Sequence, residues 1–322
     1  MLEGRDYSIA PASADASFRR YFRLSFDDGS SLIAMDAPPP QEDCRPFIKV
    51  SRLLLQAGVN VPRVLAENSE DGFLLLTDLG NTTYLQALNE DTANQLYRDA
   101  SMALIKMQMA SVEDVLPPYD ETLLNREMQL FPDWYVSKHL NVSLNQKQSE
   151  TLQNTMALLN ANILAQKRVF VHRDYHSRNL MVCYGEHEQN PGILDYQDAL
   201  YGPITYDLVS LLKDAYISWD ESQVLDWVIR YWQTAKKFGL PVPDDVADFY
   251  RDFEWMGAQR HIKVLGIFAR LNYRDGKDAY LKDMPLVMDY LRKVCERYIE
   301  LRPMLRLLDH LEGRQIKAGY TF

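Results

Sequence analysis

A short polar segment between apolar runs carries the residues best suited to chemistry. The run VFV leads into residues 172–179 (HRDYHSRN), and the run LMV follows. Sixteen residues after Asn179, the run IL leads directly into Asp195. The carboxylates of Asp174 and Asp195 and the amide of Asn179 therefore lie beside short apolar strands, whose backbones can fix their separation. Phosphoryl transfer needs such a set, because a carboxylate orients the acceptor hydroxyl while oxygen ligands hold Mg²⁺ against the triphosphate.

The elements before this segment read as an antiparallel sheet interrupted by one helix. A turn at Asp27-Asp28-Gly29-Ser30 separates the first two aromatic or apolar runs. Residues 46–57 have apolar positions at helical spacing, with Pro46 at their start and Gly58 just past their end. The expected strands are residues 19–26, 31–37 and 72–79.

Beyond Gly80 the pattern changes to long amphipathic segments with the 3.6-residue period of helices. Residues 168–203 interrupt them with short β-branched runs separated by polar loops, which is typical of a functional site inside a helical lobe. The expected helices are residues 91–110, 122–140, 145–166, 221–238, 243–271 and 283–309.

Composition excludes several classes of protein. The 322 residues carry 35 Lys and Arg against 45 Asp and Glu, and this net charge of -10 disfavours a broad nucleic-acid interface. No apolar run is long enough to span a membrane, and the first residues do not resemble a signal peptide, so we expect a cytoplasmic protein without a membrane partner. The three cysteines, Cys44, Cys183 and Cys295, are expected to be reduced and packed.

The pattern His-x-Asp-x-x-x-x-Asn, followed by an apolar-apolar-Asp strand end, resembles the kinase-like fold and most closely the aminoglycoside phosphotransferase and choline kinase superfamily. The resemblance implies an α+β, bilobal protein-kinase-like fold. An antiparallel-sheet lobe with one helix would comprise residues 1–78, and a larger, mainly helical lobe residues 79–322. It further implies that Asp174 is the catalytic base, that Asn179 and Asp195 are Mg²⁺ ligands, and that His172 supports the loop.

Other residues near this segment acquire expected roles from the same resemblance. The segment from Tyr201 to Leu208 resembles the one that opens a helix after the metal loop, where Asp207 would accept backbone N–H groups of the catalytic loop. His176 and Arg178 lie inside the loop without a role in the motif, and we keep them as candidates for contacts with the acceptor.

The nucleotide side departs from the common kinase pattern. Where a Gly-rich loop would cover the phosphates, residues 11–20 have only small residues, so a backbone cradle from Ser13 to Ser17 is expected. The third strand, residues 32–36 (LIAMD), has no phosphate-binding lysine, and Met35 or Asp36 takes its place according to register. The candidate replacements are Arg20, Arg23, Lys49 and Arg52. The hinge is expected at residues 75–80, with backbone groups of Leu76, Asp78 and Leu79 facing the adenine.

The acceptor site is expected in the helical lobe. Residues 125–135 combine charged and aromatic residues, and aromatic faces flanked by hydrogen-bonding groups suit sugar rings. Glu127, Trp134 and Tyr135 are the candidates there. Residues 259–271 place Arg260, Lys263 and Arg270 on helix faces, where a cation suits a carboxylate-bearing acceptor.

Several segments resemble one branch of this superfamily, the bacterial kinases that phosphorylate N-acetylmuramate and N-acetylglucosamine at the anomeric hydroxyl in peptidoglycan recycling. They include RRYFRL, AMDAPPPQEDCRPFIKV, GFLLLTDLGNTTYL, NREMQLFPDWY and QRHIKVLGIFARL. The missing lysine is itself part of this branch's AMDAPP segment. The resemblance implies ATP, Mg²⁺ and an amino-sugar acceptor, with no obligate protein partner. Another hydroxyl acceptor (an aminoglycoside, a choline-like alcohol or homoserine) and a catalytically weak nucleotide-binding module remain alternatives.

Overall fold

The computed structural model describes residues 4–13, 18–185 and 189–314, and the chain forms two compact units. Unit 1 comprises Met1–Leu116 and His172–Leu200, and unit 2 comprises Pro117–Val171 and Tyr201–Phe322. This grouping by packing places the segment with Asp174 and Asp195 together with the N-terminal sheet. The predicted lobes, 1–78 and 79–322, divide the chain elsewhere and stay a prediction.

Unit 1 contains a five-stranded antiparallel sheet with the strand order β1-β2-β3-β5-β4. The predicted turn between β2 and β3 is present, with Gly29 at φ +80° and a hydrogen bond from Phe26 N to Ser30 O of 3.0 Å. Two of the strands, β1 and β4, were not predicted, because their residues are mostly exposed and lack an apolar pattern. The strands are β1 Tyr7–Ser13, β2 Arg20–Phe26, β3 Ser31–Asp36, β4 Val64–Asn68 and β5 Phe73–Thr77.

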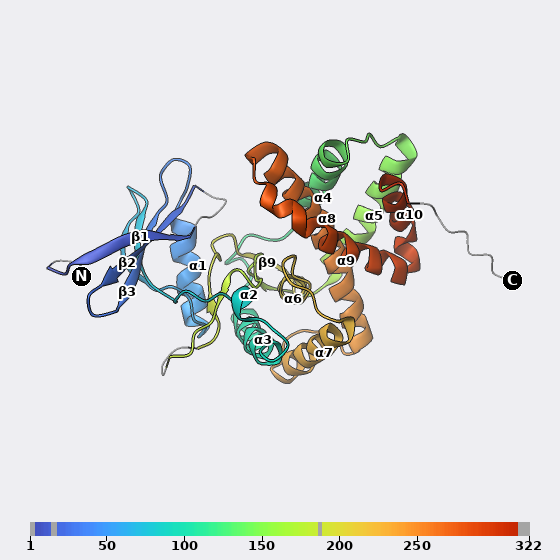
Figure 1. The fold of residues 1–322 in the computed structure, drawn as a ribbon. Coiled ribbons are helices and arrows are strands. Elements are labelled where there is room, and N and C mark those ends of the chain that lie inside the picture. The colour runs from blue at the N-terminus through green and yellow to red at the C-terminus, as the bar shows by residue number, and fades with distance from the viewer. Residues whose placement is uncertain (1–3, 14–17, 186–188, 315–322) are drawn as a thin grey trace. The chain divides into compact units, whose positions relative to one another are not determined.

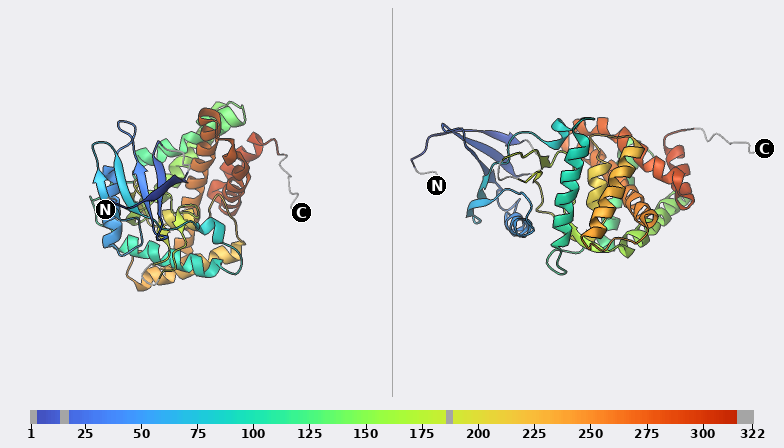
Figure 2. Two further views of the ribbon diagram at one scale, coloured as in Figure 1. Left: turned by 60° about the vertical axis from the view of Figure 1, so that its left-hand side comes forward. Right: turned by 90° about the horizontal axis from the view of Figure 1, so that it is seen from below.

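The predicted helix of this region is α1, Arg45–Gln56, with Pro46 in its first turn. Its apolar residues Phe47, Val50 and Leu54 are buried, and Figures 1 and 2 show the helix lying beside the sheet. Unit 1 also contains a two-stranded ladder of β7 and β8 that carries the polar segment. Its remaining elements are α2 Tyr84–Ala87, α3 Ala93–Met109, β7 Leu180–Met181 and β8 Gly192–Ile193.

Unit 2 is mainly helical. Its longest helix, α8, packs against α4, α5, α6, α7 and α9, so its residues form the centre of the unit's core (Figure 1). The helices are α4 Glu121–Met128, the π-helix η1 Phe131–His139, α5 Gln146–Ala165, α6 Tyr206–Leu212, α7 Glu221–Lys237, α8 Val246–Asp275, α9 Met284–Arg297 and α10 Arg302–Leu311. Two 3₁₀ turns, η2 Asp278–Asp283 and η3 Ile299–Leu301, and the strands β6 Arg168–Val171 and β9 Leu200–Pro203 complete the element order.

Two of the predicted helices are interrupted in the structure. Residues 122–140 form α4 and then the π-helix, in which Leu140 N donates to Tyr135 O, five residues earlier. Residues 283–309 form α9 and α10, which are separated at Tyr298. Proline is the physical reason in both cases: Pro132 and Pro303 lack the N–H that a continuous α-helix needs, and both sit in the first turn of the next helix.

The state of the three cysteines matches the expectation from composition. Cys44, Cys183 and Cys295 are buried free thiols, as predicted. Within the described part of the chain, no helix is both long and apolar enough to cross a membrane.

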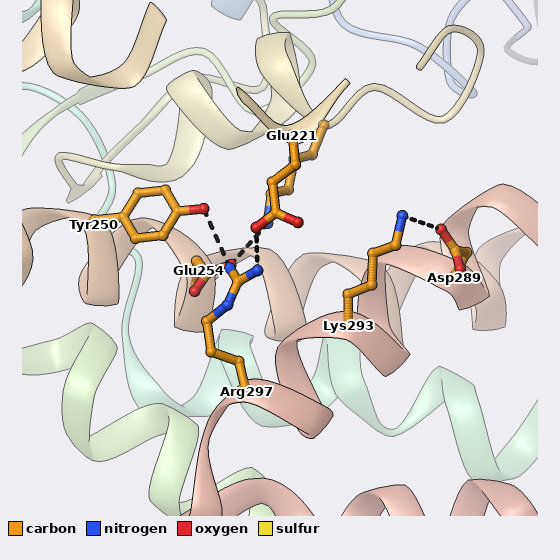
Figure 3. Close-up of polar contacts among 7 residues, drawn as sticks. Glu221, Tyr250, Glu254, Asp289, Lys293 and Arg297 are labelled. Atoms are coloured by element: carbon orange, nitrogen blue, oxygen red, sulfur yellow. Dashed lines mark hydrogen bonds and ion pairs between the residues drawn. The ribbon is translucent and has the colours of Figure 1, made fainter. Parts of the chain in front are cut away.

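An ion pair between Arg297 and the buried Glu254 lies where three helices of unit 2 meet. Glu254 on α8 is 1% exposed and accepts a short hydrogen bond from Arg297 on α9, while Lys213 Nζ lies 3.5 Å from the same oxygen. Arg297 also binds Glu221 at the start of α7 and donates to Tyr250 Oη at 3.2 Å (Figure 3). Three helices therefore meet at one guanidinium.

Replacing Arg297 with Met should lower the free energy of unfolding by about 2–3 kcal/mol. Breaking a fully buried ion pair costs about 3–5 kcal/mol, and the cost here is smaller because the Arg297 side chain is 35% exposed. Lys293, one turn earlier on α9, provides the matched control: it pairs with Asp289 at 2.8 Å, but both side chains are about half exposed (Figure 3). Lys293→Met should therefore cost about 0.3–0.5 kcal/mol. Urea unfolding at pH 7 measures both values. Equal losses of unfolding free energy in the two variants would contradict the claim that Arg297 stabilises the buried Glu254.

Candidate active site

The β7–β8 ladder brings the two predicted metal-binding residues next to each other. Leu180 pairs with Ile193 in antiparallel register, so the residues just outside the ladder, Asn179 and Leu194, also face one another. Leu194 N donates to Asn179 O at 2.9 Å, and Asp195 follows immediately. The pairing of β7 with β8 thus places Asn179 beside Asp195.

The amide of Asn179 connects all three predicted residues. Its Nδ2 donates to the backbone oxygen of Asp174 at 3.0 Å and lies 3.4 Å from Asp195 Oδ2. The loop is closed further by bonds from His176 N to Asp174 O at 3.0 Å and from Asn179 N to His176 O at 2.9 Å. The structure therefore brings Asp174, Asn179 and Asp195 together within unit 1. His176 and Arg178 lie half-buried in the same loop.

Two residues at this site have backbone conformations that non-glycine residues rarely adopt. Arg173 has φ +80° and Asp195 has φ +62°. Each such residue costs on the order of 1–3 kcal/mol and persists only where the surroundings determine it, as they do at active sites. Strained turns therefore orient Asp174 and Asp195, at a cost in folding free energy.

His172 supports this loop from its buried side. Its Nδ1 accepts a hydrogen bond from Asp174 N at 3.2 Å, so the ring proton lies on Nε2, which is 3.0 Å from Leu194 O. Burial lowers the pKa of His172 to about 4, which keeps the ring neutral near pH 7. The imidazole of His172 thus links the backbone of Asp174 to that of Leu194, the residue before Asp195.

Two buried tyrosines anchor the same loops and were not recognised in the sequence. Tyr175 donates through its hydroxyl to Ala100 O on α3 at 2.8 Å. The ring of Tyr196, the residue after Asp195, lies 4.8 Å from the ring of Phe47 on α1. The sequence could have indicated them, because each tyrosine directly follows a predicted site residue. A buried aromatic neighbour fixes a loop residue through packing.

Gln197 is another residue that sequence reasoning missed. Its Nε2 donates to Asp195 Oδ1 at 2.7 Å, while its Oε1 is buried and has no hydrogen-bond partner in the described part of the chain. A buried acceptor without a partner costs free energy unless a water or ligand donates to it. The Oε1 atom is therefore placed to accept a hydrogen bond from a water or a ligand beside Asp195.

The predicted hinge is fixed by a side chain of the sheet. Arg23 on β2 binds Asp78 through two hydrogen bonds, Nε to Oδ2 at 2.5 Å and Nη2 to Oδ1 at 3.0 Å. Ser31 Oγ donates to the same carboxylate at 2.8 Å. Burial acts to raise the pKa of Asp78, but these hydrogen bonds outweigh it and hold the pKa below its usual value. The Asp78 side chain is thus held at the end of β5 by two residues of the sheet.

The other predicted nucleotide-binding residues lie in or near the sheet. Leu76 is buried within β5 and pairs with Ile33 on β3, whereas Leu79 follows the strand. Ser13 is the last residue of β1, and Ser17 lies outside the described residues. Arg20 on β2 forms a short ion pair with Asp36, its partner in the strand register.

The predicted acceptor residues of unit 2 include a buried charged network. Glu127 Oε1 lies 3.0 Å from Lys263 Nζ, and Tyr206 Oη is 2.9 Å from the same ammonium group. Arg260 Nη1 lies 3.1 Å from that hydroxyl, and the hydroxyl of Tyr119 donates to Glu127. Glu127 and Arg260 thus bind neighbours in their own unit. Trp134 is half-buried in η1, and Asp207 is fully buried in the first turn of α6.

Comparison with known families gives the site its context. The model of the family described as phosphotransferase enzyme family matches residues 8–246, which include the sheet, the 172–179 loop and Asp195. The chain belongs to this phosphotransferase enzyme family. It is therefore a phosphotransferase, as the spacing of Asp174, Asn179 and Asp195 predicted.

Two relatives within the family match almost the whole chain. A Neisseria meningitidis protein named N-acetylmuramate/N-acetylglucosamine kinase is 50% identical over 323 residues, covering 99% of this chain and 95% of that protein. A Pseudomonas aeruginosa protein of the same name is 52% identical over 303 residues, covering 94% and 88%.

The fold agrees with this membership. The structure of an ADP-bound aminoglycoside phosphotransferase matches with a TM-score of 0.60 at 12% sequence identity, covering 91% of this chain and 95% of that one. At this identity the likeness concerns the fold alone. It confirms the predicted α+β, kinase-like fold of this phosphotransferase.

Proposed function

We propose that this phosphotransferase transfers the γ-phosphoryl group of ATP to the anomeric hydroxyl of N-acetylmuramate and N-acetylglucosamine, giving sugar 1-phosphates. The observation that carries the proposal is the identity of about half of all residues, over nearly the full chain, with two kinases named for these sugars. The clustering of Asp174, Asn179 and Asp195 supports it, because the named activity needs a base and oxygen ligands at one place.

In this proposal Asp174 orients the 1-hydroxyl of the sugar and accepts its proton as the hydroxyl attacks. The carboxylate can do this because the backbone of Asp174 is held on both sides, by His172 Nδ1 at its N–H and by Asn179 Nδ2 at its oxygen. Holding the base and the nucleophile in line contributes much of the rate in phosphoryl transfer, where the protein does little covalent chemistry.

The donor set fits Mg²⁺. A protein usually holds this ion through one or two carboxylates, with phosphate oxygens and water completing the octahedron. Asp195 supplies a carboxylate, and Asn179 supplies Oδ1 because its Nδ2 is bound to Asp174 O. Among the described residues no group of three or more His, Cys, Asp or Glu side chains is placed to hold a metal by itself.

When bound, Mg²⁺ would neutralise charge on the β- and γ-phosphate oxygens. Gln197 would assist through both groups of its side-chain amide. Its Nε2 fixes Asp195 Oδ1, and its buried Oε1 can accept a hydrogen bond from a coordinated water. His172 would keep the two loops in register, because its two ring nitrogens are bound to the backbone of Asp174 and of Leu194.

The remaining predicted contacts complete the proposal. The backbone near Ser13 and Ser17 would cover the phosphates, and Asp78 and Leu79 after β5 would present the hinge backbone to the adenine. His176 and Arg178 are the favoured acceptor contacts because they share the Asp174 loop. Glu127 and Arg260, which are buried in their own network, would then shape the acceptor region of unit 2 together with Trp134. Asp207 would support the catalytic loop, and the protein would act in the cytoplasm.

A panel of acceptors tests the proposal. ADP release from Mg·ATP should exceed the acceptor-free rate with N-acetylmuramate and N-acetylglucosamine, and should not exceed it with an aminoglycoside, choline or homoserine. Preference for one of the latter would replace the proposed substrate. ADP release with none of them, despite ATP binding, would indicate a nucleotide-binding module.

A further inference from the structure

The third strand of the sheet places an apolar residue where kinases carry a phosphate-binding lysine. Met35 on β3 is fully buried and pairs with Tyr21 on β2 and with Leu74 on β5. In kinases that lysine forms an ion pair with a glutamate of the neighbouring helix and binds the ATP phosphates. Another cation must do this if the chain binds ATP as proposed above, and the register identifies the face on which it must lie.

The face with Met35 is a buried face of the sheet. Residues paired across an antiparallel sheet share a face, so Tyr21 lies on the same side as Met35. The paired residues Met35 and Leu74 are at most 2% exposed, whereas Phe73, which pairs with Asp36 on the other face, is 51% exposed. Tyr196 follows Asp195 directly and packs on Phe47 of α1. The face of the sheet that includes Met35 is therefore its buried face, and Tyr196 beside Asp195 is buried in the same unit.

The four cations suggested by the sequence are engaged elsewhere. Arg20 precedes Tyr21 by one residue, so it lies on the opposite face, where it is 63% exposed and pairs with Asp36. Arg23 lies on the correct face but holds the hinge through Asp78. The two cations of α1 have other partners. Lys49 donates to Val115 O at 2.6 Å, and Arg52, which is exposed, lies 3.5 Å from Glu67.

Arg19 meets the requirements that these four do not. It directly precedes β2, and its side chain is 12% exposed whereas that of Arg20 is 63% exposed, which agrees with a position on the side of Tyr21 and Met35 if the alternation of β2 continues by one residue. Its Nε is 3.4 Å from Glu42 Oε2, and the two side chains are only 12% and 16% exposed. Glu42 lies three residues before α1 begins, so the pair joins the start of β2 to the start of the helix. A kinase lysine and its helix glutamate likewise join the sheet to the neighbouring helix, although from the third strand.

We propose that Arg19 is the phosphate-binding cation of this phosphotransferase and that Glu42 is the residue that positions it. The inference rests on the proposed ATP-dependent function. A guanidinium suits the task, because its five N–H donors form a planar fork that can bind Glu42 and phosphate oxygens together, with a charge that is always present. The strands β2 and β3 then need no lysine, because Arg19, the residue before β2, supplies the cation.

Nucleotide binding by matched single variants tests the assignment. Isothermal titration should show that Arg19→Met binds Mg·ATP and Mg·ADP about 10- to 100-fold more weakly than the natural chain, because a charge-assisted hydrogen bond to phosphate is lost. Binding of adenosine should be unchanged. The neighbouring Arg20→Met removes the same group from the opposite face and should change ATP affinity less than about 3-fold. Arg19→Lys keeps the charge and should recover part of the affinity.

Glu42→Gln distinguishes positioning from binding. It should raise the KM for ATP and leave the KM for the sugar unchanged, since Glu42 acts only through Arg19. The melting temperature of each variant without ligand shows whether the pair also supports the fold, and Arg19→Lys remains informative if Arg19→Met does not fold.

The inference fails if Arg19→Met, once folded, binds Mg·ATP as the natural chain does, or if Arg20→Met loses as much affinity. It is separable from the proposed function. If the natural chain binds Mg·ATP but phosphorylates no amino sugar, the acceptor proposal fails, while the dependence of ATP affinity on Arg19 still decides this assignment.

Discussion

Asp174→Asn is expected to lower kcat by about 10²–10⁴-fold with saturating N-acetylmuramate, the range usually found when a general base is removed. Asparagine has the same size, and two hydrogen bonds that hold this position use the backbone of residue 174. The loop should therefore keep its shape while the proton acceptor is lost. Steady-state kinetics measure the fall, and calorimetry should show unchanged Mg·ATP affinity.

The control for this result is a carboxylate of the same unit that lies away from the site. Asp71 is exposed in the turn between β4 and β5 and accepts a hydrogen bond from Asn68 at 2.9 Å. Asp71→Asn should leave kcat within about 2-fold of the natural value. A kcat for Asp174→Asn that also stays within this margin would mean that another group accepts the proton.

Asp195→Asn is expected to impair both binding and turnover. The change removes the negative charge that would hold Mg²⁺ beside Asn179, and a metal ion contributes several kcal/mol to charge stabilisation in such reactions. We therefore expect kcat/KM for ATP to fall on the order of 10³-fold. Unlike Asp174→Asn, this variant should lose most of the gain in ATP affinity that Mg²⁺ provides.

Calorimetry with ATP in Mg²⁺ and in a chelator measures that gain directly. The natural chain should bind ATP more tightly with Mg²⁺, whereas Asp195→Asn should bind similarly in both conditions and should match the natural chain in the chelator. A variant that retained the full Mg²⁺ effect would exclude Asp195 as a metal ligand and would leave Asn179 without its predicted partner.

The sequence predicted the candidate site because its residues are close along the chain. Asp174 and Asn179 belong to one loop, and Asp195 follows the adjacent hairpin, so local spacing was enough to group them. The helix at residues 46–57 and the helical character beyond Gly80 were likewise visible as periodicity. Where the prediction of continuous helices was wrong, at Pro132 and Pro303, the proline was present in the sequence but its local effect was overlooked.

The contacts that support the site were not predictable in the same way. Arg23 and Asp78 are 55 residues apart, and Lys263 lies more than 100 residues from Glu127. Each of these residues could bind many opposite charges, and only the fold selects the partner. The orientation of Arg19 has the same origin, since it depends on the pairing of Tyr21 with Met35 rather than on any local pattern.

Phosphorus NMR of the reaction product tests the central claim most directly. After incubation with Mg·ATP and N-acetylmuramate, the product should show one new phosphorus signal coupled to the anomeric proton of the sugar. The signal should appear with the natural chain and not, over the same time, with Asp174→Asn. A phosphorus signal coupled to a proton at another carbon, or ATP consumption without any phosphorylated sugar, would contradict the account.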